Sequence, residues 1–226
     1  MAILAAIVGV PTFTAAENPV SVQITCPIGG QVFEVIETDS CTTYPVRLMS
    51  FAPTSSCDFI TRLPQCPGNF LPMYKDFSEA DLALLRDYMV TESYDSSVDL
   101  SRFYLAYIIE KYIGNDPSLA FSILMDGYWF DPLNTFADEI YAQAFFYEAL
   151  GATRRAQAND RPFVQAMIAY VYLKSGQLEQ AQEFLNLSKV AGISDGLLPS
   201  YIARIEACMA VPDSADCAPD APIYQQ

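Results

Sequence analysis

Six cysteines and no histidine limit the chemistry open to this 226-residue chain. Two of the cysteines begin short turns, Cys26-Pro27-Ile28-Gly29-Gly30 and Cys66-Pro67-Gly68-Asn69, which we call the cysteine-proline turns. Each matches the Cys-Pro-x-Cys-Gly turn of a zinc ribbon with the second cysteine missing. A structural zinc site needs four such ligands, and the two turns supply only two. We therefore expect the cysteines to form disulfide bonds, which requires an oxidising compartment.

The remaining reactive side chains do not form a recognisable catalytic pattern. Without histidine, the chain has no Ser-His-Asp or Cys-His pair, and its cysteines lack the Cys-x-x-Cys spacing of redox enzymes. Carboxylate pairs such as Asp138 and Glu139 fall on predicted helix surfaces. The acidic loops at 95–99 and 213–216 lack the spacing of a calcium loop. The sequence thus predicts a protein that is not an enzyme and has no cofactor and no metal.

The charge balance is strongly acidic, with 27 Asp and Glu against 12 Lys and Arg and a net charge of −15. Such a surface repels a phosphate backbone, so nucleic acid is not expected as a partner. Apolar residues make up 52% of the chain, which is enough for a substantial core. The length allows one large domain or two small ones.

Residues 1–16 (MAILAAIVGVPTFTAA) are uncharged, apolar from Ala2 to Val10, and end in small residues. This pattern is typical of an export leader, although the usual basic residue before the apolar run is missing. The alternative is an ordinary apolar strand of a cytoplasmic protein. No later stretch has the roughly 20 apolar residues of a membrane-spanning helix. We therefore expect a periplasmic or secreted protein whose mature chain has no integral membrane segment.

Hydrophobic periodicity divides the rest of the chain into a β-rich and a helical part. Alternating residues predict strands at 20–24, 31–37 and 44–51. Ser78 and Asp81 would cap the first helix, and further helices follow it. The helices are predicted at about 79–89, 99–113, 118–130, 135–158, 162–175, 178–190 and 197–210. We expect a β-ribbon in 17–75, packed at one end of a helical domain in 76–211, and an irregular, acidic, proline-containing tail in 212–226.

Internal repetition in the helical part predicts helical hairpins. Residues between Arg161 and Gly192 recur at the spacing of a tetratricopeptide repeat: Ile168, Ala169, Tyr172, Gly176, Leu178, Ala181 and Leu185. Small alanines let two helices approach closely, Gly176 makes the turn, and Tyr172, Leu178 and Leu185 fill the seam. A weaker copy spans 101–128. The expected fold class is mainly α: a stack of tetratricopeptide-like helical hairpins with a small disulfide-linked N-terminal β-ribbon.

Aromatic side chains are unusually dense in the middle helices. Most are expected in the core, but there are more of them than a stack of hairpins needs. Tyrosine and tryptophan are also favoured anchors at protein interfaces. The candidate partner surface consists of Tyr104, Tyr107, Tyr128, Trp129 and Phe130.

The cysteine-proline turns followed by these helices resemble a bacterial family of uncharacterised function, whose members begin with two Cys-Pro-x-Cys-Gly knuckles. The likeness includes Asp76-Phe77-Ser78-Glu79, Leu119–Trp129 and 161–192. In that family the knuckles would be expected to hold zinc. The resemblance implies that the knuckles lie face to face and that their surviving sulfurs form a disulfide. Among fifteen possible connectivities, the implied pairs are Cys26–Cys66, Cys41–Cys57 and Cys208–Cys217. A four-thiolate zinc site at Cys26, Cys41, Cys57 and Cys66 remains the alternative.

These observations predict a non-catalytic module that binds a protein partner through its helical surface. Two other functions remain open. One is a structural subunit of an extracellular or envelope assembly, with self-assembly through the N-terminus and the tail. The other is a cytoplasmic zinc-ribbon protein.

Overall fold

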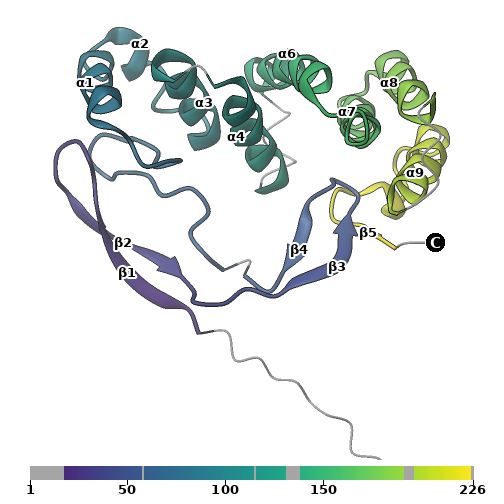
Figure 1. Cartoon of the computed structure of the whole chain (residues 1–226), viewed down its shortest axis with the longest axis horizontal. Helices are drawn as coiled ribbons and strands as arrows, with labels where there is room; N and C mark the ends of the chain where they lie inside the picture. Colours follow the sequence, from purple (N-terminus) through teal and green to yellow (C-terminus); the bar gives the residue numbers. More distant parts are fainter. Residues whose placement is uncertain (1–17, 58, 115, 131–137, 191–195, 225–226) are drawn as a thin grey trace, which may run out of the picture.

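The computed structural model describes residues 18–57, 59–114, 116–130, 138–190 and 196–224. The fold is mainly helical, as the sequence predicts, and its helices stand side by side in an arc (Figure 1). In chain order the described helices are α1 (Glu79–Tyr88), α2 (Glu92–Asp95), α3 (Arg102–Ile113), α4 (Pro117–Phe130), α6 (Glu139–Arg155), α7 (Arg161–Lys174), α8 (Leu178–Val190) and α9 (Leu198–Ala210).

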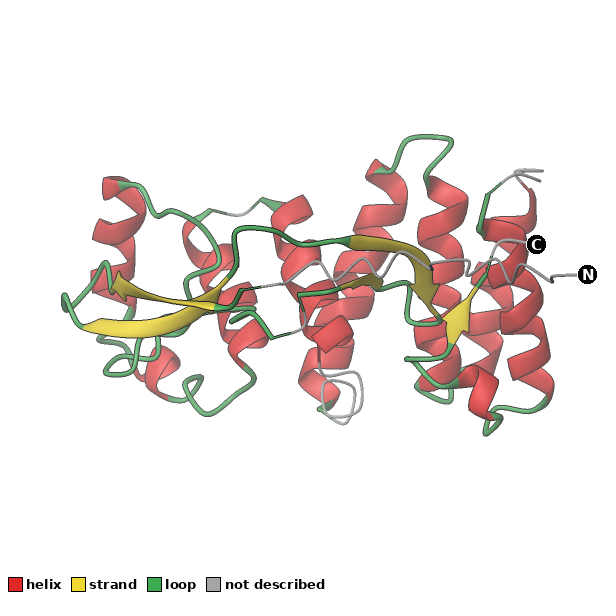
Figure 2. Cartoon of the chain, turned by 90° about the horizontal axis from the view of Figure 1, so that it is seen from below, coloured by secondary structure: helices red, strands yellow, loops and turns green. Residues whose placement is uncertain are grey.

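The strands form a strap across the open side of this arc. Two antiparallel strands, β1 (Val20–Thr25) and β2 (Val32–Glu37), lie near α1. A second sheet with the order β4-β3-β5 lies near α9 and consists of β3 (Thr43–Leu48), β4 (Pro53–Ser55) and β5 (Pro222–Ile223). Figure 2 shows the strap running along the row of helices. The prediction that the ribbon packs at one end of the helices is therefore wrong, because its two sheets reach opposite ends of the arc.

Local signals explain where individual helices begin and turn. Ser78 accepts a hydrogen bond from the Asp81 backbone N–H, and the Asp81 carboxylate accepts one from the Ser78 backbone N–H, so the expected capping box forms. Helices α7 and α8 pack as a hairpin, with Gly176 in the left-handed conformation (φ 74°) at the turn between them. Ala169 and Ala181 are fully buried in it. Leu178, predicted to fill the seam, is instead 47% exposed because it lies at the first position of α8.

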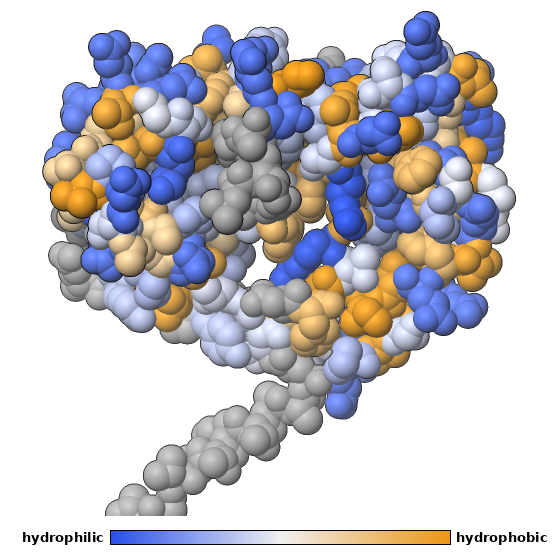
Figure 3. All heavy atoms as spheres, turned by 180° about the vertical axis from the view of Figure 1, so that it is seen from behind, coloured by the Kyte–Doolittle hydropathy of each residue, from blue (hydrophilic) through white to orange (hydrophobic). Residues whose placement is uncertain are grey.

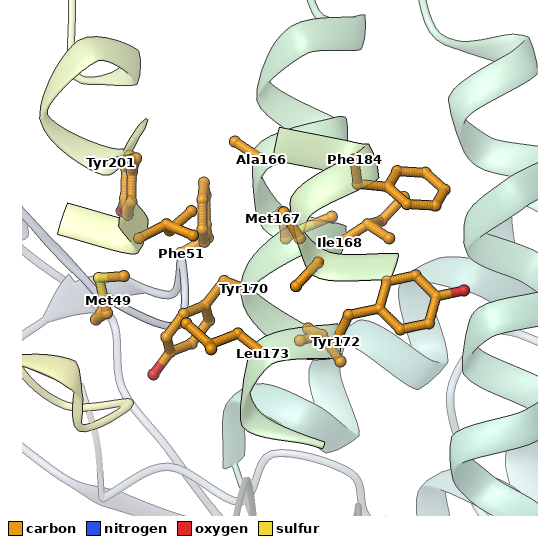
Figure 4. Packing of buried hydrophobic residues seen from close by; sticks show 14 of the residues in the cluster. Met49, Phe51, Ala166, Met167, Ile168, Tyr170, Tyr172, Leu173, Phe184 and Tyr201 are labelled. Carbon is orange, nitrogen blue, oxygen red and sulfur yellow. The ribbon is translucent and has the colours of Figure 1, made fainter. Parts of the chain in front are cut away.

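The main core joins the strap to the last helices. Phe51, in the turn after β3, stacks on Tyr201 of α9 with a centroid distance of 3.8 Å (Figure 4). Its ring also meets Phe163 of α7 edge-to-face, with a centroid distance of 5.0 Å. The neighbouring backbone is held by the tail, because Met49 N–H donates to the Ala221 carbonyl (2.7 Å). The tail after 212, expected to be irregular, thus contains a short 3₁₀ turn (Ala215–Cys217) and strand β5.

The two cysteine-proline turns share a hydrogen bond and a left-handed residue at the equivalent position. In each turn the cysteine N–H donates to the carbonyl five residues later, from Cys26 to Gln31 (2.8 Å) and from Cys66 to Leu71 (2.9 Å). The fifth residue of each turn, Gly30 or Phe70, is left-handed, with φ of 66° and 59°. The Cys26–Cys66 disulfide joins the two turns, which lie against each other.

All six cysteines are paired, in the connectivity that the family resemblance implies: Cys26–Cys66, Cys41–Cys57 and Cys208–Cys217. The four-thiolate alternative does not form, because the sulfurs of Cys26, Cys41, Cys57 and Cys66 are used in two separate bonds. Gly29 and Asn69 occupy the positions of the two missing cysteines. The Asn69 side-chain amide donates a hydrogen bond to the Ile28 carbonyl of the other turn (2.8 Å). A hydrogen bond and a disulfide thus link the turns.

Candidate functional site: the central opening

Three cavities adjoin between the strap and helices α3 and α4. Their volumes are about 330, 510 and 420 Å³, and both Arg62 and Phe130 line all three. Figure 3, which shows the molecule from behind, shows the surface hollowed between the helices and the strap. We call these adjoining cavities the central opening.

Helix α4 supplies one wall of the opening through its last residues, Asp126, Trp129 and Phe130. Their position depends on Gly127, which is buried where α4 meets α3 and α6. A methyl group at Gly127 would lie 2.8 Å from Cβ of Phe103 and closer still to Oη of Tyr141. The close approach of the three helices therefore requires a glycine here.

Arg62 comes from the strap side of the opening. Its guanidinium lies over the ring of Phe130, 4.6 Å from the centroid, and donates a hydrogen bond to the Cys57 carbonyl (3.0 Å). Such a contact between a cation and an aromatic face is attractive. Arg62 and Phe130 therefore link the segment after β4 to α4, and both line all three cavities.

Asp126 is the acidic group of the opening. Burial raises the pKa of its carboxyl above the usual range, and the positive charge of Arg62 opposes that rise. The opening is thus lined by one carboxylate, the guanidinium groups of Arg62 and Arg102, and several aromatic rings. No histidine is available as a general base, and no three cysteine or carboxylate side chains gather as a metal site in the part of the chain that the structure describes.

The structure separates the five aromatic residues of the predicted partner surface. Tyr128 is 1% exposed and belongs to the core, so its assignment to a surface is wrong. Tyr104 and Tyr107 are half-buried and pack against the main core outside the cavities. Trp129 and Phe130 do line the opening: the indole N–H of Trp129 donates to the Ser50 carbonyl (3.0 Å), and Phe130 is 44% exposed.

Sequence reasoning missed two buried glutamates, Glu110 and Glu148. Glu110, with no exposed surface, accepts hydrogen bonds from Lys75 Nζ (2.8 Å), Tyr74 Oη (3.1 Å) and the Asp116 backbone N–H (3.0 Å). Glu148 contacts Lys111 Nζ at 3.2 Å and accepts a hydrogen bond from a tyrosine, Tyr107. Both glutamates thus have a lysine and a tyrosine as partners. Glu110 holds α3 against the segment before α1, and Glu148 holds α6 against α3. Because every group is satisfied, these clusters are structural.

No protein-family model, curated protein or solved structure matches this chain. The family resemblance described above therefore rests on the two cysteine-proline turns and the helical pattern alone. None of the described helices is both long and apolar enough to cross a membrane. The three disulfides fit a protein that resides outside the cytoplasm.

Proposed function

We propose that this protein is a non-catalytic binding module, exported to the periplasm or secreted, that captures a segment of a protein partner at the central opening. The sequence pattern favours a helical surface as the binding site. The strap crosses the open side of the arc (Figure 1), and the cavities around Phe130 lie between it and helices α3 and α4.

The observation that carries the proposal is the position of Phe130. It is a large apolar side chain, 44% exposed, at the junction of three cavities. Aromatic anchors that fill pockets dominate the binding energy of many protein interfaces. The nearby Arg62 and Asp126 supply polar groups that would fix the orientation of a bound segment.

Site-specific photo-crosslinking tests the proposal. A photoreactive phenylalanine analogue placed at position 130 should give discrete adducts in native envelope or culture fluid, and Phe130→Ala should prevent capture of the same proteins by affinity purification. Tyr147 is the matched control, because it is an aromatic residue of α6 that is 69% exposed and lines none of the three cavities. If positions 130 and 147 give the same adducts, or Phe130→Ala and Tyr147→Ala recover the same proteins, the proposal is wrong.

A further inference from the structure

Strand β1 has one neighbour in the described part of the chain, β2, and its hydrogen-bonding pattern can be derived from the register. Cys26 lies opposite Gln31 in the continuation of that register and donates to its carbonyl (2.8 Å). In an antiparallel pair, hydrogen-bonded and non-hydrogen-bonded positions alternate. Val20, Val22 and Ile24 therefore bond to β2, while the backbone groups of the alternate residues Ser21, Gln23 and Thr25 point away from it.

The partner strand supports this alternation independently. Ile36 lies opposite Ser21, and its backbone groups bond to Thr61 on the other side of β2, with N–H to Oγ1 at 2.9 Å and carbonyl to N–H at 2.8 Å. The position opposite Ser21 is thus a non-hydrogen-bonded one. Thr61 therefore covers the outer edge of β2 at Ile36. On the opposite edge of the hairpin, no described residue outside the hairpin hydrogen-bonds to Ser21, Gln23 or Thr25.

The free edge of β1 lacks the features that normally prevent strand addition. Protein edges are usually protected by charged residues, prolines, bulges or covering segments. The sequence of β1, Val-Ser-Val-Gln-Ile-Thr, contains no charge and no proline, and its pairing with β2 has no bulge. Ser21, Gln23 and Thr25 are all exposed, and β1 lies on the side of its hairpin away from the helices (Figure 1). A further strand could therefore pair with it.

We propose that this strand is β1 of a second copy of the chain, paired antiparallel about a two-fold axis at Gln23. Gln23 then faces Gln23 of the second copy, and Ser21 faces Thr25. All three outward-pointing residues thereby enter hydrogen-bonded pairs, each of which exchanges two N–H···O bonds. If the register shifted by one residue, the outward-pointing backbone groups of one copy would face groups of the other copy that bond to β2. If it shifted by two residues, only two of the three hydrogen-bonded pairs would remain.

The side chains are as self-complementary as the backbone. On the outer face the pairing brings hydroxyl groups together at Ser21 and Thr25 and amide groups together at Gln23, and such cross-strand pairs are stabilising. On the other face Val22 meets Ile24 of the second copy. Since β1 is uncharged, no like charges oppose each other within the interface. The net charge of −15 on each copy does oppose association, so the dimer should strengthen as salt screens that repulsion.

Sedimentation equilibrium of the full chain, up to about 1 mM protein, tests the proposal. We expect a dimer whose dissociation constant decreases as salt is raised. Gln23→Glu and Gln23→Lys each place like charges on the axis and should each weaken the dimer about fivefold or more, whereas an equal mixture of the two should associate more tightly than either alone. Gln23→Pro removes an N–H that β2 does not use and should abolish the dimer without lowering the helical circular dichroism signal.

Gln182 provides the control, because it is an exposed glutamine on α8. Gln182→Glu and Gln182→Lys should dimerise like the unmodified chain. A chain that stays monomeric over the whole concentration range would overturn the proposal. So would a Gln23→Pro variant that dimerises normally, or a mixture of the two charged variants that gains no affinity.

Discussion

Phe51 stacks on Tyr201, with ring centroids 3.8 Å apart and ring planes 11° from parallel. The hydroxyl of the same tyrosine donates to the Leu48 carbonyl at 2.8 Å. Phe51 is held at a φ of 68°, a conformation that is unusual for a bulky residue and persists only where the surroundings enforce it. The strap is therefore attached to the last helix by an aromatic stack and a hydrogen bond, both at a strained turn.

Phe51→Ala should lower the free energy of unfolding by about 3–5 kcal/mol, because it empties a fully packed aromatic site and keeps the strained backbone. Urea unfolding followed by circular dichroism measures the change. Phe59→Ala is the control, since that residue of the strap is 39% exposed and should cost less than about 1 kcal/mol. Equal losses for the two variants would contradict the role given to Phe51.

Two glycines in helix interiors should respond oppositely to alanine. Gly127→Ala should destabilise the protein by about 1–3 kcal/mol, because the new methyl group meets Phe103 and Tyr141 between packed helices. Gly151→Ala should stabilise it by up to about 1 kcal/mol, because the methyl meets only the movable end of Arg155 and alanine favours the helix. Thermal unfolding of both variants compares them directly. A stabilising Gly127→Ala would show that the three helices do not require the close approach.

Replacing both cysteines of one disulfide by alanine should lower the free energy of unfolding. The loss should be larger for the disulfide that closes the longer loop of chain. Cys26 and Cys66 are 40 residues apart and Cys208 and Cys217 only 9, while all four side chains are buried. Loop-closure entropy assigns about 4 kcal/mol to the first bond and about 2.5 kcal/mol to the second. Urea unfolding of the two double cysteine-to-alanine variants should show this order, and the reverse order would exclude loop entropy as the main contribution.

Alkaline pH should unfold the protein steeply. Burial raises the pKa of several tyrosines in the folded state: Tyr74, Tyr94, Tyr107, Tyr128, Tyr141, Tyr170 and Tyr201. A raised pKa means that the folded state keeps protons that the unfolded state loses above its ordinary pKa of about 10. Stability from these groups is therefore complete below about pH 10 and falls above it, by about 1.4 kcal/mol per pH unit for each tyrosine.

Tyr201→Phe separates this effect from the titration of lysines. The variant loses the hydrogen bond to Leu48 but also removes one tyrosine from the alkaline transition. Its free energy of unfolding, measured between pH 9 and pH 11.5, should fall less steeply with pH than that of the parent chain. Parallel curves would mean that this hydroxyl has the same pKa in both states.

The parts of the fold that the sequence predicted are those set by neighbours along the chain. The capping box at Ser78, the turn at Gly176 and the close helices at Ala169 and Ala181 depend on residues a few positions apart. The strap could not be placed in this way. Strand β5 pairs with β3 although the chain separates Arg47 from Ile223 by most of its length, and no local pattern marks Pro222–Ile223 as a strand.

The candidate site was predicted in part, for a related reason. Periodicity locates aromatic residues on α4 but does not tell which side of the helix faces another element. Tyr128 and Phe130 are two positions apart, and one is in the core while the other borders the opening. Arg62 was not singled out at all, because only the path of the strap brings it over Phe130.

The reach of the strap has a consequence for the order in which the molecule is assembled. Leu48 and its hydrogen-bonding partner Tyr201 are 153 positions apart, so the early strands must wait until almost the whole polypeptide has emerged before they can dock. The helical hairpins, whose contacts are local, can form first, whereas long-range strand pairing is slow. We therefore expect maturation to end with seating of the strap, and refolding to show a late phase in which Trp129 fluorescence changes as its indole meets Ser50.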